Sequence, residues 1–402
     1  MKDESRERVL EDYENAVLQN KEAYERGDVK ASVEYIYSNQ VSDAAVITDK
    51  FYKDPIQVIS VVKRTKVGMD GLMIELAKNM TTHHDDDFVL DINKVLIITG
   101  MSNVLWETDM KEKMPLCFRE NVFHHGKLHR LKPILSGIKN ALLIIDEIDS
   151  GDKEGQKLHV LLRESGLLDI KYMKENNIRF VFVSATMIRE LRDLYKWGDL
   201  HHIHYMTVPK NYISHQDFLD MHLIQEFYAI NTEELAKRWI MEDILGRYGD
   251  DCRVHIIRSD EKNKSCIIKA CKNLGVSYKN HSCNDRISHE ELTKIFDHVE
   301  NHIVLIVKGF YRRANLIPNA WKMKIGATHE RFVQSCDTSV QVQGLPGRMT
   351  GYWKDVILGG HITGPYRTSV EAMIQYEKFY QEPSGKNKYR SEEHTSELQS
   401  RE

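Results

Sequence analysis

Two adjacent carboxylates stand at the end of a strongly apolar run near the middle of the chain. The segment LLIIDEIDS places Asp146 and Glu147 directly after residues 141–145. At the carboxyl edge of a parallel sheet, such side chains face the crevice in which α/β proteins bind ligands. There the first carboxylate would hold Mg²⁺, directly or through water, and the second would position or deprotonate an attacking water. The pair therefore predicts a metal ligand, Asp146, and a catalytic base, Glu147, with a solvated loop start as the alternative.

A second apolar run, FVFVSAT, repeats this geometry, because a buried strand again ends in small residues, Ser184, Ala185 and Thr186. The two motifs in this order and spacing resemble those of superfamily 2 helicases, in which a DEAD-like box is followed by a strand that ends in SAT. The resemblance implies that Ser184 and Thr186 help to couple the nucleotide site to movement along a nucleic-acid strand.

The segment SVQVQGLPGRMTGY in the second half of the chain resembles the sixth motif of the same family. In that motif a glutamine and a Gly-Arg pair face the ATP that the first domain holds, which implies these roles for Gln343 and Arg348. A guanidinium offers a planar fork for the charge that develops on phosphate in the transition state, so Arg348 is the expected arginine finger. The spacing departs from the usual Q-x-x-G-R by one residue, and Gly351 and Tyr352 stand near the place of a second arginine.

The segment VISVVKRTKVGMDGLMIELAKNM has the strand, turn and helix of a phosphate-binding loop, but not its usual residues. Such a loop wants GK[ST] at the start of its helix, and here Gly68 is followed by Met69 and Asp70. A methionine offers no charge to phosphate, and an aspartate at a helix N-terminus would compete with it. Either Arg64 or Lys66 reaches into the site from the turn, or the ATPase activity is weak or lost, or the sequence of the loop is recorded wrongly. The candidate nucleotide-binding residues of this turn are Arg64, Thr65, Lys66, Gly68, Met69 and Asp70.

Three further segments carry candidate residues. Gln40 stands upstream of the loop where related helicases place a glutamine that reads adenine. The segment IVLIVKGFYRRANLI ends a strand in Lys308 and carries Arg313 into a helix, where cations suit the phosphates of ATP or of a tracked strand; ordinary surface cations are the alternative. The run from His83 to Asp87 could ligate a metal, although a polar loop explains it better.

The resemblance covers about residues 35 to 380. Its layout, including LIITGMSNVLWETDM (96–110) and the QGLPGR box, looks most like that of helicases from large DNA viruses and phages. It implies an ATP- and Mg²⁺-dependent motor with two RecA-like domains, which binds ATP between them and DNA or RNA across both. The alternative is a nucleic-acid-binding module that keeps the two-domain clamp and has lost hydrolysis. Met69 and Asp70 favour this module, whereas the three intact boxes favour the motor.

The elements that must position these residues alternate along the chain. Short β-branched runs at 57–62, 94–99, 141–146 and 178–184 are separated by helical patterns, which is typical of a buried parallel sheet flanked by helices. A second series follows two helical segments between about 215 and 248, with strands expected at 252–258, 302–308 and 322–327. We therefore predict an α/β fold with the following parts: a charged N-terminal helix (1–29), domain 1 (30–212), domain 2 (213–382) and a tail (383–402).

Composition narrows the class of protein. The tail from Arg390, RSEEHTSELQS, looks like a translated sequencing adapter, so the native C-terminus is expected to differ. No apolar run is long enough for a membrane span, and the charged N-terminus is unlike a signal peptide, which predicts a cytoplasmic or nuclear protein. The net charge of −4 places any nucleic-acid surface in a local groove. The six cysteines form no CxxC pair, and Cys266, Cys271, His281 and Cys283 fit no common zinc finger.

Overall fold

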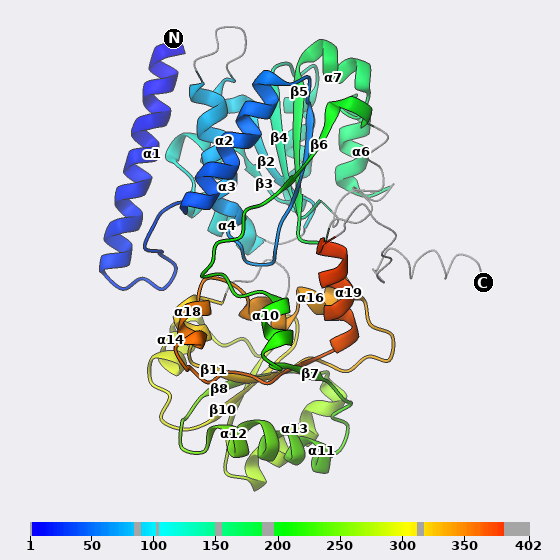
Figure 1. Cartoon of the computed structure of the whole chain (residues 1–402). Helices are drawn as coiled ribbons and strands as arrows, with labels where there is room; N and C mark the ends of the chain where they lie inside the picture. The colour runs from blue at the N-terminus through cyan, green and yellow to red at the C-terminus, as the bar shows by residue number, and fades with distance from the viewer. Residues whose placement is uncertain are drawn as a thin grey trace, which may run out of the picture. The chain divides into compact units, whose positions relative to one another are not determined.

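The computed structural model describes residues 2–83, 90–101, 104–148, 155–186, 197–311 and 317–381. The chain divides into two compact units, residues 1–209 (domain 1) and 210–402 (domain 2), which Figure 1 shows in blue to green and in green to red. The predicted boundary at 212/213 lies three residues from this division. The predicted tail from 383 lies outside the described residues.

Domain 1 contains a six-stranded sheet in the order β3-β2-β4-β5-β1-β6, in which every strand pair is parallel. Parallel sheets are covered on both faces, and the central strands are accordingly apolar and buried along their length. The strands are β1 (Val58–Val62), β2 (Val95–Thr99), β3 (Val122–Phe123), β4 (Ala141–Asp146), β5 (Ile178–Ser184) and β6 (His201–Tyr205).

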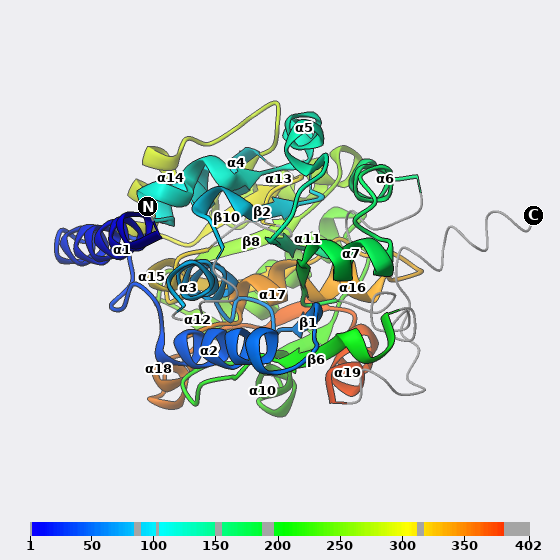
Figure 2. The same cartoon turned by 90° about the horizontal axis from the view of Figure 1, so that it is seen from above.

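The helices of domain 1 flank this sheet, and in both views α1 is the outermost of them, next to α3 (Figure 1, Figure 2). The Tyr13 hydroxyl donates to Glu75 Oε2 at 2.8 Å, and Lys78 Nζ lies 4.4 Å from the centre of the Tyr13 ring. The charged N-terminal segment thus belongs to domain 1. The helices are α1 (Lys2–Glu25), α2 (Ser38–Lys53), α3 (Met69–Thr82), α4 (Val104–Lys113), α5 (Leu131–Leu135), α6 (Lys157–Glu164) and α7 (Ile170–Asn176).

Domain 2 contains a second six-stranded parallel sheet in the order β7-β12-β11-β8-β10-β9. Its strands are β7 (Ile224–Glu226), β8 (Val254–Arg258), β9 (Ser277–His281), β10 (Ile303–Val307), β11 (Ile325–His329) and β12 (Tyr366–Thr368). One core cluster joins this sheet to the helical segments beside it, among them the π-helix Ile240–Leu245, through residues that include Trp239, Ile257, Ile267 and Val304.

Helices lie on both sides of the domain 2 sheet. In Figure 1, α11, α12 and α13 lie on one side and α10, α16 and α18 on the other. The helices are α10 (His215–Asp220), α11 (Glu233–Trp239), α12 (Gly246–Tyr248), α13 (Glu261–Asn273), α14 (His289–Asp297), α15 (Asn319–Lys322), α16 (Thr338–Val342), α17 (Leu345–Met349), α18 (Lys354–Leu358) and α19 (Val370–Gln381).

The predicted fold class, two α/β domains that each contain a parallel sheet flanked by helices, is confirmed. The four strands predicted in domain 1 are β1, β2, β4 and β5, within one residue at each end. The strand expected at 322–327 begins later, at Ile325, because Asn319–Lys322 forms α15. The strands that the sequence did not reveal, such as β6 with the sequence HHIHY, are polar or only a few residues long.

Candidate nucleotide-binding site

Asp146 and Glu147 lie at the carboxyl edge of the domain 1 sheet, as predicted. Asp146 ends β4 and is paired with Thr99 of β2 and Val183 of β5. Glu147 follows with a φ of 52°, a left-handed conformation that few non-glycine residues adopt. Both residues are buried: the exposed fraction is 4% for Asp146 and 7% for Glu147. Two adjacent carboxylates without water around them require a positive charge nearby.

Lys63 provides that charge, and sequence reasoning did not identify it. It directly follows β1, and its Nζ lies 3.6 Å from Asp146 Oδ1 and 3.5 Å from Glu147 Oε1. Burial lowers the pKa of Lys63, but the charges of the two carboxylates outweigh burial and hold it above its usual value. One signal could have revealed it: Lys63 follows VISVV just as the carboxylates follow LLII, so strand ends from one parallel sheet bring them to one edge.

Asp146 is suited to bind a divalent cation. Its Oδ2 accepts a hydrogen bond of 3.0 Å from Trp106 Nε1 of α4, which fixes the carboxylate. Its Oδ1 is buried and makes no hydrogen bond within the described part of the chain. Burial raises the pKa of Asp146 to about 6, while Lys63 acts in the opposite direction. Such a buried carboxylate oxygen, with the Lys63 ammonium 3.6 Å away, fits a hard cation such as Mg²⁺.

The turn after β1 brings the predicted loop residues beside this cluster. Lys66 and Gly68 have positive φ angles of 57° and 91°, and Gly68 precedes the first turn of α3. Met69, at the position of the usual lysine, is 4% exposed and packs in the core. Thr65 is buried as well, whereas Arg64 and Lys66 are half-buried. The loop therefore has the expected shape, and its buried cation comes from the strand end.

Asp70 is held by a lysine from another helix. Its Oδ2 lies 2.5 Å from Nζ of Lys113, the last residue of α4. Burial raises the pKa of Asp70, but the charge and hydrogen bond of Lys113 outweigh burial and hold it below its usual value. The repulsion that the sequence suggested between Asp70 and phosphate is therefore offset by a partner in the same domain.

Gln40 contacts the same loop. It lies near the start of α2, is 3% exposed, and its Oε1 accepts a hydrogen bond of 2.9 Å from the Tyr37 backbone. Its Nε2 donates to the carbonyl oxygen of Gly68. A Cβ atom on Gly71 would lie 2.0 Å from Gln40 Oε1, so only glycine leaves room for this side chain. Gln40 thus joins α2 to the loop and to the first turn of α3.

Ser184 and Thr186 also lie next to the loop. Ser184 is paired with Val62 across β5 and β1, and the Lys63 backbone donates to the Ser184 carbonyl oxygen at 3.4 Å. The Ser184 Oγ accepts a hydrogen bond of 3.0 Å from the Thr186 backbone, and both side chains are buried. Because the Lys63 backbone is hydrogen-bonded to Ser184, any shift of Ser184 and Thr186 would also move Lys63.

Gln343 and Arg348 lie in domain 2, on either side of a tightly packed turn. Gln343 directly follows α16, and Arg348 belongs to α17; Gln343 is 4% exposed and Arg348 is 3% exposed. A Cβ atom on Gly347 would lie 1.9 Å from the Val342 carbonyl oxygen, so the two short helices meet with no space for a side chain. This close approach accounts for the glycine in the QGLPGR box.

A buried ion pair supports this turn and was not anticipated. Arg258 Nε lies 2.7 Å from Glu330 Oε2, and Glu330 Oε1 accepts a hydrogen bond of 2.6 Å from the Leu345 backbone at the start of α17. Lys322 is also buried and donates to the Thr350 carbonyl oxygen at 2.6 Å. Burial lowers the pKa of Lys322 to about 7, and the nearby charge of Arg348 acts in the same direction.

The remaining candidates are not part of either cluster. Arg313 and residues 84–87 of the polar run lie outside the described residues. Lys308 is exposed and pairs with Glu261 at 3.4 Å. Within the described ranges, no group of three histidine, cysteine or acidic side chains could hold a metal ion, and this includes Cys266, Cys271, His281 and Cys283. No helix in these ranges is long and apolar enough to cross a membrane.

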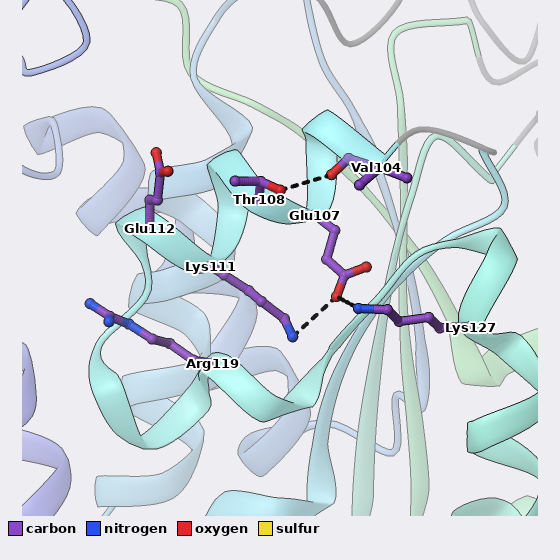
Figure 3. A pocket seen from close by; sticks show the side chains of 7 residues that line it. All are labelled: Val104, Glu107, Thr108, Lys111, Glu112, Arg119 and Lys127. Carbon is purple, nitrogen blue, oxygen red and sulfur yellow. Dashed lines mark hydrogen bonds and ion pairs between the residues drawn. The ribbon is translucent and has the colours of Figure 1, made fainter.

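A hollow of about 310 Å³ lies beside α4 in domain 1. Figure 3 shows the buried Glu107 between Lys111 and Lys127, whose ammonium groups lie 3.1 and 2.6 Å from Glu107 Oε1. Both lysines are therefore held by a carboxylate of the protein. The hollow is lined by Val104, Glu107, Thr108, Lys111, Glu112, Arg119 and Lys127.

No protein-family model matches the sequence, and no curated protein matches it significantly. Among solved structures, S. cerevisiae Dbp5 bound to RNA and ADP BeF3 is similar, with 12% identity over 89% of this chain and 93% of that chain and a TM-score of 0.42. A DEAD box protein from the hyperthermophile Methanococcus jannaschii is also similar, with 12% identity over 87% and 92% of the two chains and a TM-score of 0.43. These likenesses are too distant to assign a role to any residue here, so the candidate site rests on its own geometry.

Proposed function

We propose that this chain is an ATP-dependent helicase or translocase that acts on a DNA or RNA strand. The observation that carries the proposal is the buried cluster of Lys63, Asp146 and Glu147 at the ends of β1 and β4. A protein that used the sheet only as a scaffold would have no physical need to bury two carboxylates and a lysine at the ligand-binding edge. The likeness to viral and phage helicases remains a resemblance of the sequence.

Each candidate residue would have a separate role in ATP hydrolysis. ATP would supply the phosphoanhydride bond that is cleaved, and Mg²⁺ would offset the phosphate charge. Asp146 would hold the metal through Oδ1, and Glu147 would orient and deprotonate the attacking water. Gln40 would position the loop for the nucleotide. Arg348, with Gln343 five residues before it in the sequence, would stabilise the developing charge when the domains close.

A second function is favoured by one observation. Met69 is apolar and buried at the position where a phosphate-binding lysine is expected. A chain that had lost hydrolysis while keeping its two domains would be a nucleic-acid-binding module. In that case, the protein would bind strands with the same affinity in the presence and absence of ATP.

The experiment is to measure ATP hydrolysis by the purified chain with Mg²⁺, alone and with single-stranded DNA, single-stranded RNA or duplexes. A motor should hydrolyse ATP slowly by itself and faster with the strand that it tracks. Binding of either strand without hydrolysis, even at millimolar ATP, would replace the motor by the binding module.

A further inference from the structure

The ammonium of Lys63 is the buried cation of the candidate site. Its side chain is 11% exposed, and the two carboxylates it faces are 6% and 9% exposed. Burying an ammonium costs several kcal/mol, a cost that is offset only where opposite charges are close. Lys63 is therefore held at the carboxyl edge of the sheet by the carboxylates that would serve the metal and the water.

The other cations near the loop are placed differently. Lys113 is paired with Asp70, and Lys66 is half-buried in the left-handed turn. The position that would usually carry the phosphate-binding lysine is the buried Met69. Lys63 contacts both carboxylates, because its backbone directly follows β1.

The charges of the cluster leave room for an exchange of partners. One lysine and two carboxylates give the cluster a net charge of −1. A bound divalent cation would change this net charge to +1. The cation would then neutralise the carboxylates and release the ammonium toward phosphate oxygens. The flexible four-carbon stem of a lysine permits such a movement without a change of backbone.

We propose that Lys63 is the phosphate-binding lysine of this chain, supplied from the end of β1 in place of the usual lysine at the start of α3. Without nucleotide it is the counter-ion of Asp146 and Glu147; with nucleotide and Mg²⁺ it binds the phosphates. This inference rests on the proposed function, since it names a binding residue for the same nucleotide.

The experiment compares variants of the full chain, one of which keeps the net charge that the cluster has in the parent. Lys63→Gln alone leaves two buried carboxylates without a counter-ion and can unfold domain 1. The double variant Lys63→Gln with Glu147→Gln removes one charge of each sign, so its net charge equals that of the parent. It is compared with Glu147→Gln alone, and Lys139→Gln, an exposed lysine before the amino end of β4, is the matched control.

The equilibrium dissociation constant of ATP is measured by fluorescence for each variant, with Mg²⁺ and again with EDTA. Urea unfolding verifies that each variant is folded. Loss of a charged hydrogen-bond donor should weaken ATP binding roughly 10- to 100-fold in the double variant relative to Glu147→Gln. The weakening should be large with Mg²⁺ and much smaller in EDTA, because the metal is what releases the ammonium from the carboxylates to phosphate, and Lys139→Gln should bind as the parent does under both conditions.

Two results would overturn the inference, and they differ. If the parent and Glu147→Gln bind ATP and the folded double variant binds it equally well, Lys63 is a structural counter-ion only, and the proposed function stands. Lys66→Gln would then be expected to show the loss. If the parent and Glu147→Gln bind no ATP at millimolar concentration, the proposed function fails together with the inference.

Discussion

At the scale of single residues, Glu147 offers the sharpest test of hydrolysis. Replacing Glu147 by Gln removes the carboxylate that would take a proton from water and changes little volume. Hydrolysis should fall by about 10²- to 10⁴-fold, while the affinity for ATP stays within a few-fold of the parent value. Single-turnover hydrolysis and equilibrium binding measure the two quantities separately. Equal rates in variant and parent would remove Glu147 from the role of base.

Arg348 is expected to act on hydrolysis more than on strand binding. Arg348→Ala should lower strand-stimulated hydrolysis by about 10³-fold or more, as loss of an arginine finger does. Arg348→Lys should not restore it, because an ammonium lacks the planar fork. Since Arg348 is 3% exposed, its removal also disturbs packing, so domain 2 must first be shown to be folded. A main effect on strand affinity would place Arg348 at the nucleic-acid surface instead.

The positions of site residues could be predicted only where a short sequence motif contains them. DEID and SAT predicted the carboxyl edge because strand ends of one parallel sheet meet there. Lys63 could not be found by the pattern G-K-[ST], which expects the lysine after the glycine and not before the turn. The partner of Asp70 was equally hidden, because Lys113 comes from α4, more than forty residues away, and the ion pair depends on tertiary packing.

At the scale of elements, the contact between α2 and α3 depends on a glycine. Gly71→Ala should lower the free energy of unfolding of domain 1 by about 1–3 kcal/mol, because its Cβ would displace Gln40 from Gly68. In a Gln40→Ala background the same change should be neutral or stabilising, since alanine is favoured over glycine inside a helix. Urea unfolding of the four variants gives the coupling. Additive effects would mean that Gln40 can move away without cost.

The strands that the sequence predicted and those that it missed differ in their surroundings. Central strands are buried on both faces and read as continuous apolar runs, as in IRFVFVS of β5. Edge strands keep an exposed side and can be polar: β6 is HHIHY, and β9 is SYKNH. The pairing of an edge strand is set by the neighbouring strand and not by its own composition. The order of strands at the edges of each sheet could therefore not be predicted.

At the scale of the whole molecule, buried histidines make stability depend on pH. The Ala327 backbone donates to His255 Nδ1 at 3.0 Å, so His255 Nε2 carries a proton and faces His302 Nδ1 at 3.0 Å. Burial, followed by His302 and Arg253, lowers the pKa of His255 well below its usual value. Burial also lowers the pKa of His329 to about 4. Folded domain 2 therefore binds fewer protons at these sites than the unfolded chain does between pH 6.5 and about 4.

Because the unfolded chain takes up these protons first, the free energy of unfolding should fall as the pH drops below about 6.5. The expected slope is roughly 1.4 kcal/mol per pH unit for each such histidine. Urea unfolding at pH 7.5 and pH 5 measures it. Replacing Trp106 and Trp197 by Phe leaves the three tryptophans of domain 2 as its reporters. Equal stability at the two pH values would mean that the rings are hydrated and titrate freely.

The burial of Met69 has a consequence for the evolutionary history of this loop. A mutation to lysine at this position would place a charge where 4% of the residue is exposed, and a mutation of Asp70 to threonine would strand Lys113. The first of these changes should lower stability because it buries an unpaired charge, whereas the second releases an ammonium whose side chain is 37% exposed. If Lys63 binds phosphate as proposed, the burial of Met69 would thus favour keeping the cation at the strand end. Genome searches that demand the usual loop would pass over such chains, whereas a spatial template of one strand-end lysine facing two carboxylates would retrieve them.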